Sequence, residues 1–269
     1  MRHIFRIATY VLGFCSLSVV PAWGGESSGF IKAIESAKQF VVPIVCFGKN
    51  PDTKEPFLIS VEGTGFFVTG DRRVITAGHA ARSISAQQRI PSCAIPAIYL
   101  PTEGWDSSKP SVAIRYIPIG PCIAGDTLDI GACDLSEDLA TDSSLKVRPK
   151  ASELDGTIYP DGTPVAFTGF PLSFVQPITS QGIIGTYRGP NVTLGPTELV
   201  IDKNAWPGAS GSPVYGVDGK VLGIVVQRGF SDASGLAFAI PGRAIMKFLA
   251  DNPIGKEQKQ TAPAQDQKH

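Results

Sequence analysis

A serine in a glycine-rich turn and a histidine far upstream are the residues of this chain whose types and settings could perform nucleophilic chemistry. Ser210 lies at the centre of the segment Pro207-Gly208-Ala209-Ser210-Gly211-Ser212-Pro213. His79 follows the small residues Thr76-Ala77-Gly78 at the end of an apolar run. A serine hydroxyl becomes a nucleophile when an imidazole takes its proton. The two segments together therefore predict acyl-transfer chemistry.

The histidine content singles out one candidate base. The chain contains three histidines, His3, His79 and His269. His3 lies in an N-terminal segment that we expect to be removed, and His269 is the last residue of a polar tail. If the folded protein performs imidazole chemistry, His79 performs it.

Size and composition indicate the class of fold. The chain has 269 residues, enough for a large core in one or two domains, and its 24 basic side chains balance its 24 acidic ones. This balance gives no electrostatic reason to expect binding to nucleic acid or to an acidic membrane surface. The 29 glycines and 22 prolines are spread along the whole chain. They favour many short strands, and thus an all-β barrel or sandwich.

The first 24 residues have the features of a secretory signal peptide. Arg2 and Arg6 precede a short apolar core at 7–20, and Ala22-Trp23-Gly24 offers small residues for cleavage. A membrane anchor is the alternative, although the apolar run is short for a bilayer span. Cleavage would leave 22 basic and 24 acidic side chains, a net charge of −2. We therefore expect an exported protein, periplasmic or secreted, with no membrane contact after cleavage.

Four cysteines would remain after this cleavage. Cys122 and Cys133 flank a short turn-rich segment, which favours pairing them with each other and then Cys46 with Cys93, among three possible pairings. Unpaired buried cysteines are the alternative. The chain has no Cys-x-x-Cys motif and few histidines, so we expect no metal site.

Apolar patterns predict a short helix at each end of a strand-rich region. The N-terminal helix covers 28–39 and the C-terminal helix Ala244 to Asp251, and the polar segment 141–160 could link two halves. The final residues, 253–269, carry no core-forming pattern and predict a disordered tail. The strand candidates are 40–47, 63–68, 74–77, 97–100, 112–117, 128–135, 164–169, 182–187, 198–201, 214–215, 221–226 and 236–240.

Several of these segments together resemble the trypsin-like (chymotrypsin-fold) serine proteases, in particular their bacterial exported branch. The segments at 63–68 and 74–80 resemble the histidine region of that family, and 208–213 resembles its nucleophile motif. The strands at 221–224 and 238–241 resemble those that follow the nucleophile. The resemblance covers roughly residues 40–250. The order of the two motifs, histidine before serine, makes it specific.

The resemblance implies a fold and its boundaries. It implies an all-β peptidase domain at 25–252 made of two six-stranded antiparallel barrels, roughly 40–140 and 155–240, with short N- and C-terminal helices. The active site would lie between the barrels.

The resemblance also implies the roles of the site residues. Ser210 would be the nucleophile, His79 the general base, and the N–H groups of Gly208 and Ser210 the oxyanion hole. The family places an aspartate before an apolar strand between histidine and serine. Asp129 is favoured because the residues that follow it can be buried, whereas Asp138 matches the tripeptide but precedes a poor strand.

The chain departs from the family at positions that affect activation and specificity. Ala209 replaces the aspartate that zymogen-activated members pair with a new N-terminus, which predicts activity without that switch. Asn204 would lie at the base of the primary pocket, with Val226, Arg228 and Leu236 on its walls. An uncharged base favours small or medium uncharged side chains over Lys or Arg, although Asp232 could supply a charge from a loop.

The sequence thus predicts an exported serine endopeptidase that acts on protein or peptide substrates through an acyl-enzyme and needs no cofactor. The main alternative is a catalytically inactive homologue that binds partners through the same site. An esterase with the same triad is a second alternative, and a structural sandwich a third. The sequence contains no signal for oligomeric state.

Overall fold

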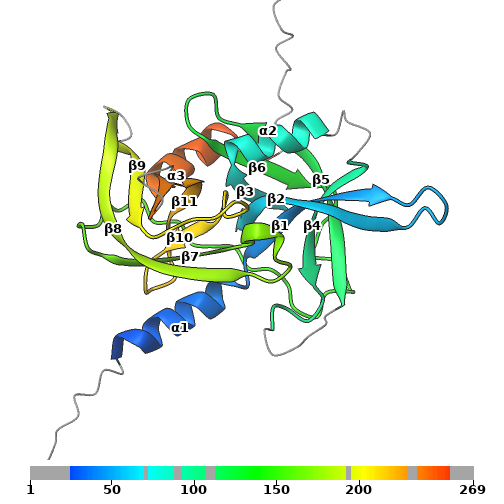
Figure 1. Cartoon of the computed structure of the whole chain (residues 1–269), viewed down its shortest axis with the longest axis horizontal. Coiled ribbons are helices and arrows are strands. Elements are labelled where there is room, and N and C mark those ends of the chain that lie inside the picture. Colours follow the sequence, from blue (N-terminus) through cyan, green and yellow to red (C-terminus); the bar gives the residue numbers. More distant parts are fainter. Residues whose placement is uncertain are drawn as a thin grey trace, which may run out of the picture.

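The structure, a computed structural model, consists of two closed six-stranded antiparallel barrels in one chain (Figure 1). It describes residues 25–69, 72–87, 93–106, 113–191, 195–228 and 235–254. The strand order is β1-β2-β3-β6-β5-β4 in the first barrel and β10-β11-β12-β9-β8-β7 in the second. The predicted fold class is therefore confirmed. The predicted signal segment and nearly all of the predicted tail lie outside the described residues.

The strands of the first barrel overlap the predicted apolar runs, but β2 and β5 are longer than predicted. The strand β5 covers Ile114–Ala124, whereas the sequence predicts 112–117. The strand β2 covers Pro56–Thr69, whereas the sequence predicts only 63–68. Its first half pairs with the end of β1 as a two-stranded arm that extends beyond the barrel (Figure 1), and its Phe57 and Ile59 are exposed. The bounds of the barrel strands are β1 Val41–Lys49, β2 Pro56–Thr69, β3 Arg73–Ala77, β4 Ile95–Pro101, β5 Ile114–Ala124 and β6 Ile130–Leu135.

The second barrel follows the predicted order of strands from residue 164 onward. Its longest pair, β8 with β9, extends past the predicted runs on both sides. A single-turn helix, η1 (Pro171–Ser173), follows β7. The bounds are β7 Pro164–Gly169, β8 Ile178–Asn191, β9 Gly195–Asp202, β10 Pro213–Tyr215, β11 Val221–Arg228 and β12 Leu236–Pro241.

Three α-helices accompany the barrels. The helices α1 (Gly25–Ala37) and α3 (Gly242–Asp251) correspond to the two predicted terminal helices. The helix α2 (Gly78–Gln87), which the sequence patterns do not predict, begins directly after β3 and carries the candidate histidine in its first turn. Its apolar positions are mostly alanines, Ala80 and Ala81, so its helical pattern is weak.

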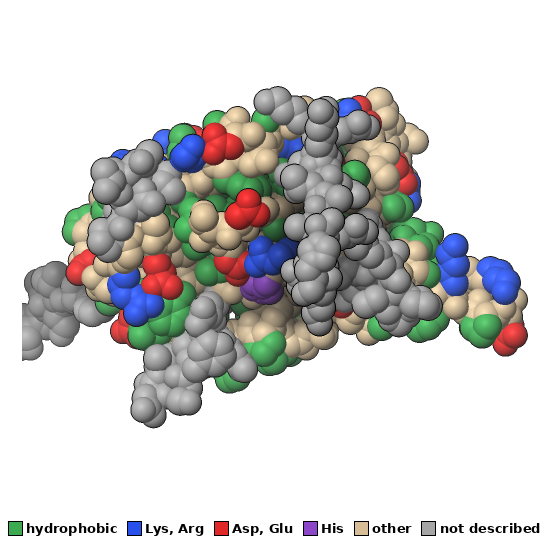
Figure 2. Space-filling model, turned by 90° about the horizontal axis from the view of Figure 1, so that it is seen from above, with side chains coloured by type: hydrophobic (Ala, Val, Ile, Leu, Met, Phe, Trp, Pro, Cys, Tyr) green, Lys and Arg blue, Asp and Glu red, His purple; other side chains and the backbone are tan. Residues whose placement is uncertain are grey.

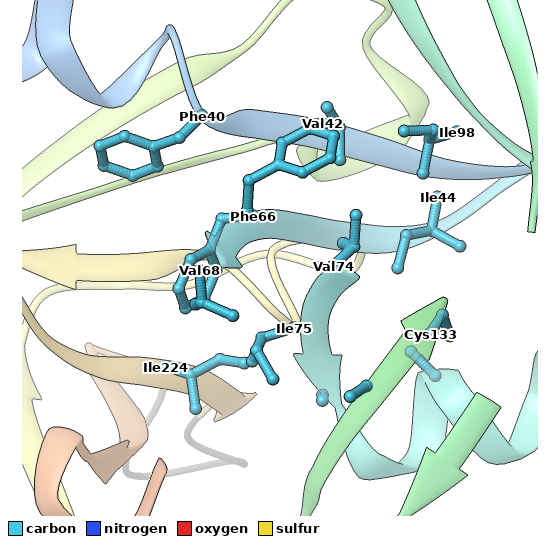
Figure 3. Close-up of a cluster of buried hydrophobic side chains, with 14 of the residues drawn as sticks. Phe40, Val42, Ile44, Phe66, Val68, Val74, Ile75, Ile98, Cys133 and Ile224 are labelled. Carbon is cyan, nitrogen blue, oxygen red and sulfur yellow. The ribbon is translucent and has the colours of Figure 1, made fainter. Parts of the chain in front are cut away.

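The hydrophobic core continues from one barrel into the other. Figure 3 shows Phe66, Val74 and Ile75 of the first barrel in one cluster with Ile224 of β11 in the second. All four side chains are fully buried. Burying such side chains contributes on the order of 1.5–3 kcal/mol each, so the shared cluster fixes the two barrels against each other.

Two disulfides join strands of the first barrel, with the pairing that the sequence favoured. Cys46 of β1 is bonded to Cys93, and Cys122 of β5 is bonded to Cys133 of β6. The second pair is a directly opposed cross-strand pair of that sheet.

Candidate active site

His79 and Asp129 form a hydrogen-bonded pair at the start of α2. His79 Nδ1 lies 2.6 Å from Asp129 Oδ2, and the His79 backbone N–H donates to Asp129 Oδ1 at 2.7 Å. The imidazole is about half exposed, whereas the carboxylate is 30% exposed. In Figure 2 a histidine side chain (purple) is visible at the surface, with acidic and basic side chains beside it. The Nδ1 contact leaves Nε2 as the nitrogen that can exchange protons.

The pairing of strands β3 and β6 brings this aspartate to the histidine. The last residue of β3, Ala77, is paired with Ile130, the first residue of β6. Because the strands are antiparallel, Gly78, which follows Ala77, lies opposite Asp129, which precedes Ile130. Gly78 N–H donates to the Asp129 carbonyl at 2.9 Å. A Cβ on Gly78 would lie 2.8 Å from Asp129 Oδ1. Glycine therefore allows the carboxylate to approach the helix this closely.

The Asp129 carboxylate is held in its charged form. Burial alone would raise its pKa, but hydrogen bonds and charge attraction from His79, with a further contribution from Arg82, outweigh burial and lower the pKa below its usual value. A charged acceptor is the form that orients an imidazole by its Nδ1–H.

Asp138, the alternative acid, performs a local task in this structure. It is exposed, and its Oδ1 accepts the backbone N–H of Ala140 at 3.0 Å. Thr141 Oγ1 donates to its carbonyl oxygen. These contacts stabilise a turn, and the histidine contact belongs to Asp129.

Ser210 lies in the turn between β9 and β10, next to the first barrel. Its carbonyl oxygen accepts the Thr64 N–H at 2.8 Å. A Cβ on Gly63 would lie 3.0 Å from that carbonyl oxygen and 3.6 Å from the Cβ of Ala80, the residue after His79. The serine turn and the first turn of α2 therefore both lie beside Gly63, where the second barrel meets the first.

The turn before Ser210 depends on a glycine with a positive φ. Gly208 has φ +91°, and a Cβ there would lie 2.5 Å from the Phe170 carbonyl, so only glycine fits. The Pro207 carbonyl accepts the Leu172 N–H at 2.7 Å. Because the peptide is trans, the Gly208 N–H points away from Leu172. Within the described residues, neither this N–H nor that of Ser210 has an intramolecular acceptor.

A family model described as trypsin-like peptidase domain matches residues 63–224, more than half of the chain. The chain belongs to the trypsin-like peptidase family. It is 27% identical to serine protease HTR4 of Rattus norvegicus in an alignment of 228 residues that covers 82% of this chain and 40% of that protein. It also superposes on the crystal structure of the Rv3671c protease from M. tuberculosis in its active form, with a TM-score of 0.57 and 16% sequence identity, over 96% and 95% of the two chains. This second likeness concerns the fold.

The residues predicted to form the specificity pocket of this peptidase domain lie at one end of the second barrel. Leu236, the first residue of β12, is paired with Asp202, two positions before Asn204. Val226 occupies a bulge of β11, the strand that pairs with β12 on its other side. Val226 is buried and Asn204 is partly buried. The Arg228 side chain and Asp232 lie outside the described residues.

Three residues that contact the site were missed by the sequence analysis. Arg82 donates to Asp129 Oδ1 at 2.9 Å. Thr64 Oγ1 donates to the Gly208 carbonyl at 2.9 Å and accepts the Phe170 N–H, and Leu172 supports the Pro207 carbonyl. The spacing of Arg82, three residues after His79 on a helix, is the one sequence signal that could have identified it.

The described residues contain no group of three or more His, Cys, Asp or Glu side chains that could hold a metal ion. None of the helices described here has the length and hydropathy to cross a membrane.

Proposed function

We propose that this protein is an exported serine endopeptidase that cleaves peptide bonds through Ser210, His79 and Asp129. The observation that carries the proposal is the 2.6 Å contact of His79 Nδ1 with Asp129 Oδ2, with the Ser210 turn and the first turn of α2 both beside Gly63. Family membership supports the same chemistry. The chain spans 40% of the length of HTR4, so the proposal takes no substrate or partner from that protein.

The proposed reaction has two halves, both using the same proton carrier. Ser210 Oγ attacks the peptide carbonyl carbon while His79 Nε2 takes the hydroxyl proton, and the imidazolium then donates that proton to the departing amine. The product is an ester between Ser210 and the substrate's acyl group. Water attacks this ester, His79 accepts the water proton, and Ser210 recovers its hydroxyl proton as the acid leaves. Asp129 stays ionised throughout.

The developing oxyanion would be bound by the free N–H groups of Gly208 and Ser210. Such donors act most strongly when they are fixed before the reaction, and losing one typically costs about 10²–10³ in rate. Here the carbonyls on both sides of Gly208 are already bonded, that of Pro207 to Leu172 and that of Gly208 to Thr64. This arrangement supports an oxyanion hole that forms without an aspartate at position 209.

Export and specificity complete the proposal. Two disulfides are typical of oxidising compartments, which agrees with a periplasmic or secreted protein. Asn204 gives the pocket an uncharged base, so we propose cleavage after small or medium uncharged side chains. The wall position Leu236 would narrow the pocket further.

Labelling with a fluorophosphonate tests the proposal. We expect the wild-type protein to be labelled, and both Ser210→Ala and His79→Ala to lose labelling. Ser212→Ala is the matched control, because this neighbouring serine is fully buried and should not be needed. A folded wild type that resists labelling would support the inactive, partner-binding homologue instead.

Peptide cleavage must follow labelling, because an activated serine also hydrolyses esters. Turnover of extended peptide amides, abolished in Ser210→Ala, would support the endopeptidase over an esterase. A panel of such peptides varied at the residue before the cleaved bond tests the pocket. Preference for Lys or Arg there would contradict the uncharged pocket.

A further inference from the structure

Arg82 stands directly beside the acid of the proposed triad. It lies on α2 one helical turn after His79, and its Nη2 donates to Asp129 Oδ1 at 2.9 Å. Residues three apart on a helix share one face, so the histidine and the arginine reach the same carboxylate from the same helix. His79 holds Oδ2, and Arg82 shares Oδ1 with the His79 backbone N–H.

The second guanidinium nitrogen fixes the turn that carries the acid. Arg82 Nη1 donates to the Gly125 carbonyl at 3.3 Å. Gly125 begins the segment between β5 and β6, and its N–H donates to the Ile130 carbonyl at 2.8 Å. The arginine therefore bridges both ends of the turn from Gly125 to Asp129. It holds the carboxylate in position and also places a positive charge beside it.

Asp129 is thus contacted by two side chains of one helix. Among the described residues, His79 and Arg82 are the groups in ionic contact with it, and both belong to α2. Asp126, on the same turn as Asp129, is exposed. A carboxylate beside an imidazole favours the protonated ring, which cannot act as a base. A permanent positive charge beside that carboxylate weakens this preference for the protonated ring, since Arg keeps its charge at all relevant pH values.

We propose that Arg82 is a positioning residue that holds the Asp129 turn and extends the range in which His79 is a neutral base toward lower pH. The inference rests on the proposed function for its catalytic meaning, but its electrostatic part concerns the imidazole alone. The Arg82 side chain is 54% exposed, so solvent screens its charge and the effect is moderate.

The direct test is an NMR titration of His79 in protein labelled at histidine. The background is Ser210→Ala, which prevents self-cleavage, and His79→Ala identifies the signal among the histidines of the chain. Arg82→Gln removes the charge, and Arg82→Lys keeps it. We expect Arg82→Gln to move the titration midpoint upward, because it removes the positive charge beside Asp129, and Arg82→Lys to leave it near that of the parent. An unchanged midpoint in Arg82→Gln, or an equal shift in both variants, would overturn the inference.

Steady-state kinetics supply the second readout, in protein that retains Ser210. The acid limb of kcat/KM should move upward with the titration midpoint in Arg82→Gln and should return in Arg82→Lys. A uniform loss of kcat at every pH, with an unmoved limb, would indicate a purely structural role and contradict the proposal. If the wild type cleaves no peptide, the proposed function fails, whereas the NMR titration still decides the role of Arg82.

Discussion

Gly78 shows how tightly the acid is held against the histidine helix. A Cβ there would lie 2.8 Å from Asp129 Oδ1 and 3.0 Å from the backbone atoms of Asp129 and Ile130. We expect Gly78→Ala to displace the carboxylate and to lower kcat roughly tenfold, since misplacement by about 1 Å can cost 10²-fold. Steady-state kinetics on a peptide substrate measure this.

A matched glycine provides the control for this variant. A Cβ on Gly185 of β8 would have its nearest neighbour at 3.5 Å, an ordinary contact, so Gly185→Ala should keep the wild-type kcat. Equal activity in Gly78→Ala would show that the acid tolerates a shift, and would weaken the role given to the close approach.

At the residue scale, the sequence singled out candidate groups by the residues in their own segments. His79 and Ser210 are marked by the residues around them, and Asp129 was favoured because a buried strand follows it. Arg82 was missed because its contact depends on a turn more than forty residues away, whose position is set by strand pairing. The requirement for glycine at 78 has the same long-range origin.

At the element scale, the segment after β7 supports the serine turn. Leu172 and Ser173 have φ of 56° and 60°, a left-handed conformation that is costly for residues other than glycine. This conformation presents the Leu172 N–H to the Pro207 carbonyl. Tyr99 of β4 ties the same segment to the first barrel, because its hydroxyl donates to the Val175 carbonyl at 2.7 Å. Burial raises the pKa of Tyr99 well above its usual value, so the phenol keeps this proton.

We expect Leu172→Pro to lower kcat by about 10², the typical loss for one oxyanion donor. Proline has no N–H to donate and cannot adopt a positive φ, so the Pro207–Gly208 peptide loses the contact that orients it. Leu172→Gly is the control, since it keeps the N–H and adopts this φ freely. Kinetics with a thermal melt of each variant provide the measurement. Wild-type kcat in a folded Leu172→Pro would show that the turn holds its shape alone.

The elements that sequence patterns predicted are the ones with buried faces. The run at 164–169 corresponds to β7 without error, since its residues after Pro164 are buried. The first half of β2 was missed because its apolar side chains are exposed in an arm with no barrel behind them. The helix α2 was missed because small residues and a start at Gly78 carry little helical signal. Sequence patterns reveal segments whose apolar side chains are buried on one face. The first half of β2 and the helix α2 lack such a pattern.

At the scale of the whole molecule, the two barrels are stabilised differently. Both disulfides lie in the first barrel, and the shared core joins it to the second. Arg73 of β3, which is 4% exposed, donates two hydrogen bonds to Asp134 and a third to the Asn252 carbonyl after α3. The segment directly after α3, which follows the last strand of the second barrel, is therefore anchored on the first barrel.

The two disulfides close loops of different length, which predicts different contributions to stability. Cys46–Cys93 spans 47 residues and Cys122–Cys133 spans 11. In the chain-entropy description these loops correspond to about 4 and about 3 kcal/mol of the free energy of unfolding. We expect Cys46→Ala/Cys93→Ala to lose more stability than Cys122→Ala/Cys133→Ala. Each pair of substitutions serves as the control for the other, because each removes one disulfide of the first barrel.

Urea unfolding monitored by tryptophan fluorescence measures the difference, with m-values compared to verify that the unfolded states are equivalent. Both double variants should remain active below their unfolding transitions, because no disulfide cysteine contacts Ser210, His79 or Asp129 among the described contacts. If Cys122→Ala/Cys133→Ala, which lacks the disulfide of the shorter loop, were the less stable variant, the contribution of that bond to the pairing of β5 with β6 would exceed the difference in loop entropy. The first barrel would then depend on its cross-strand bond to hold β6, and with it Asp129, in register.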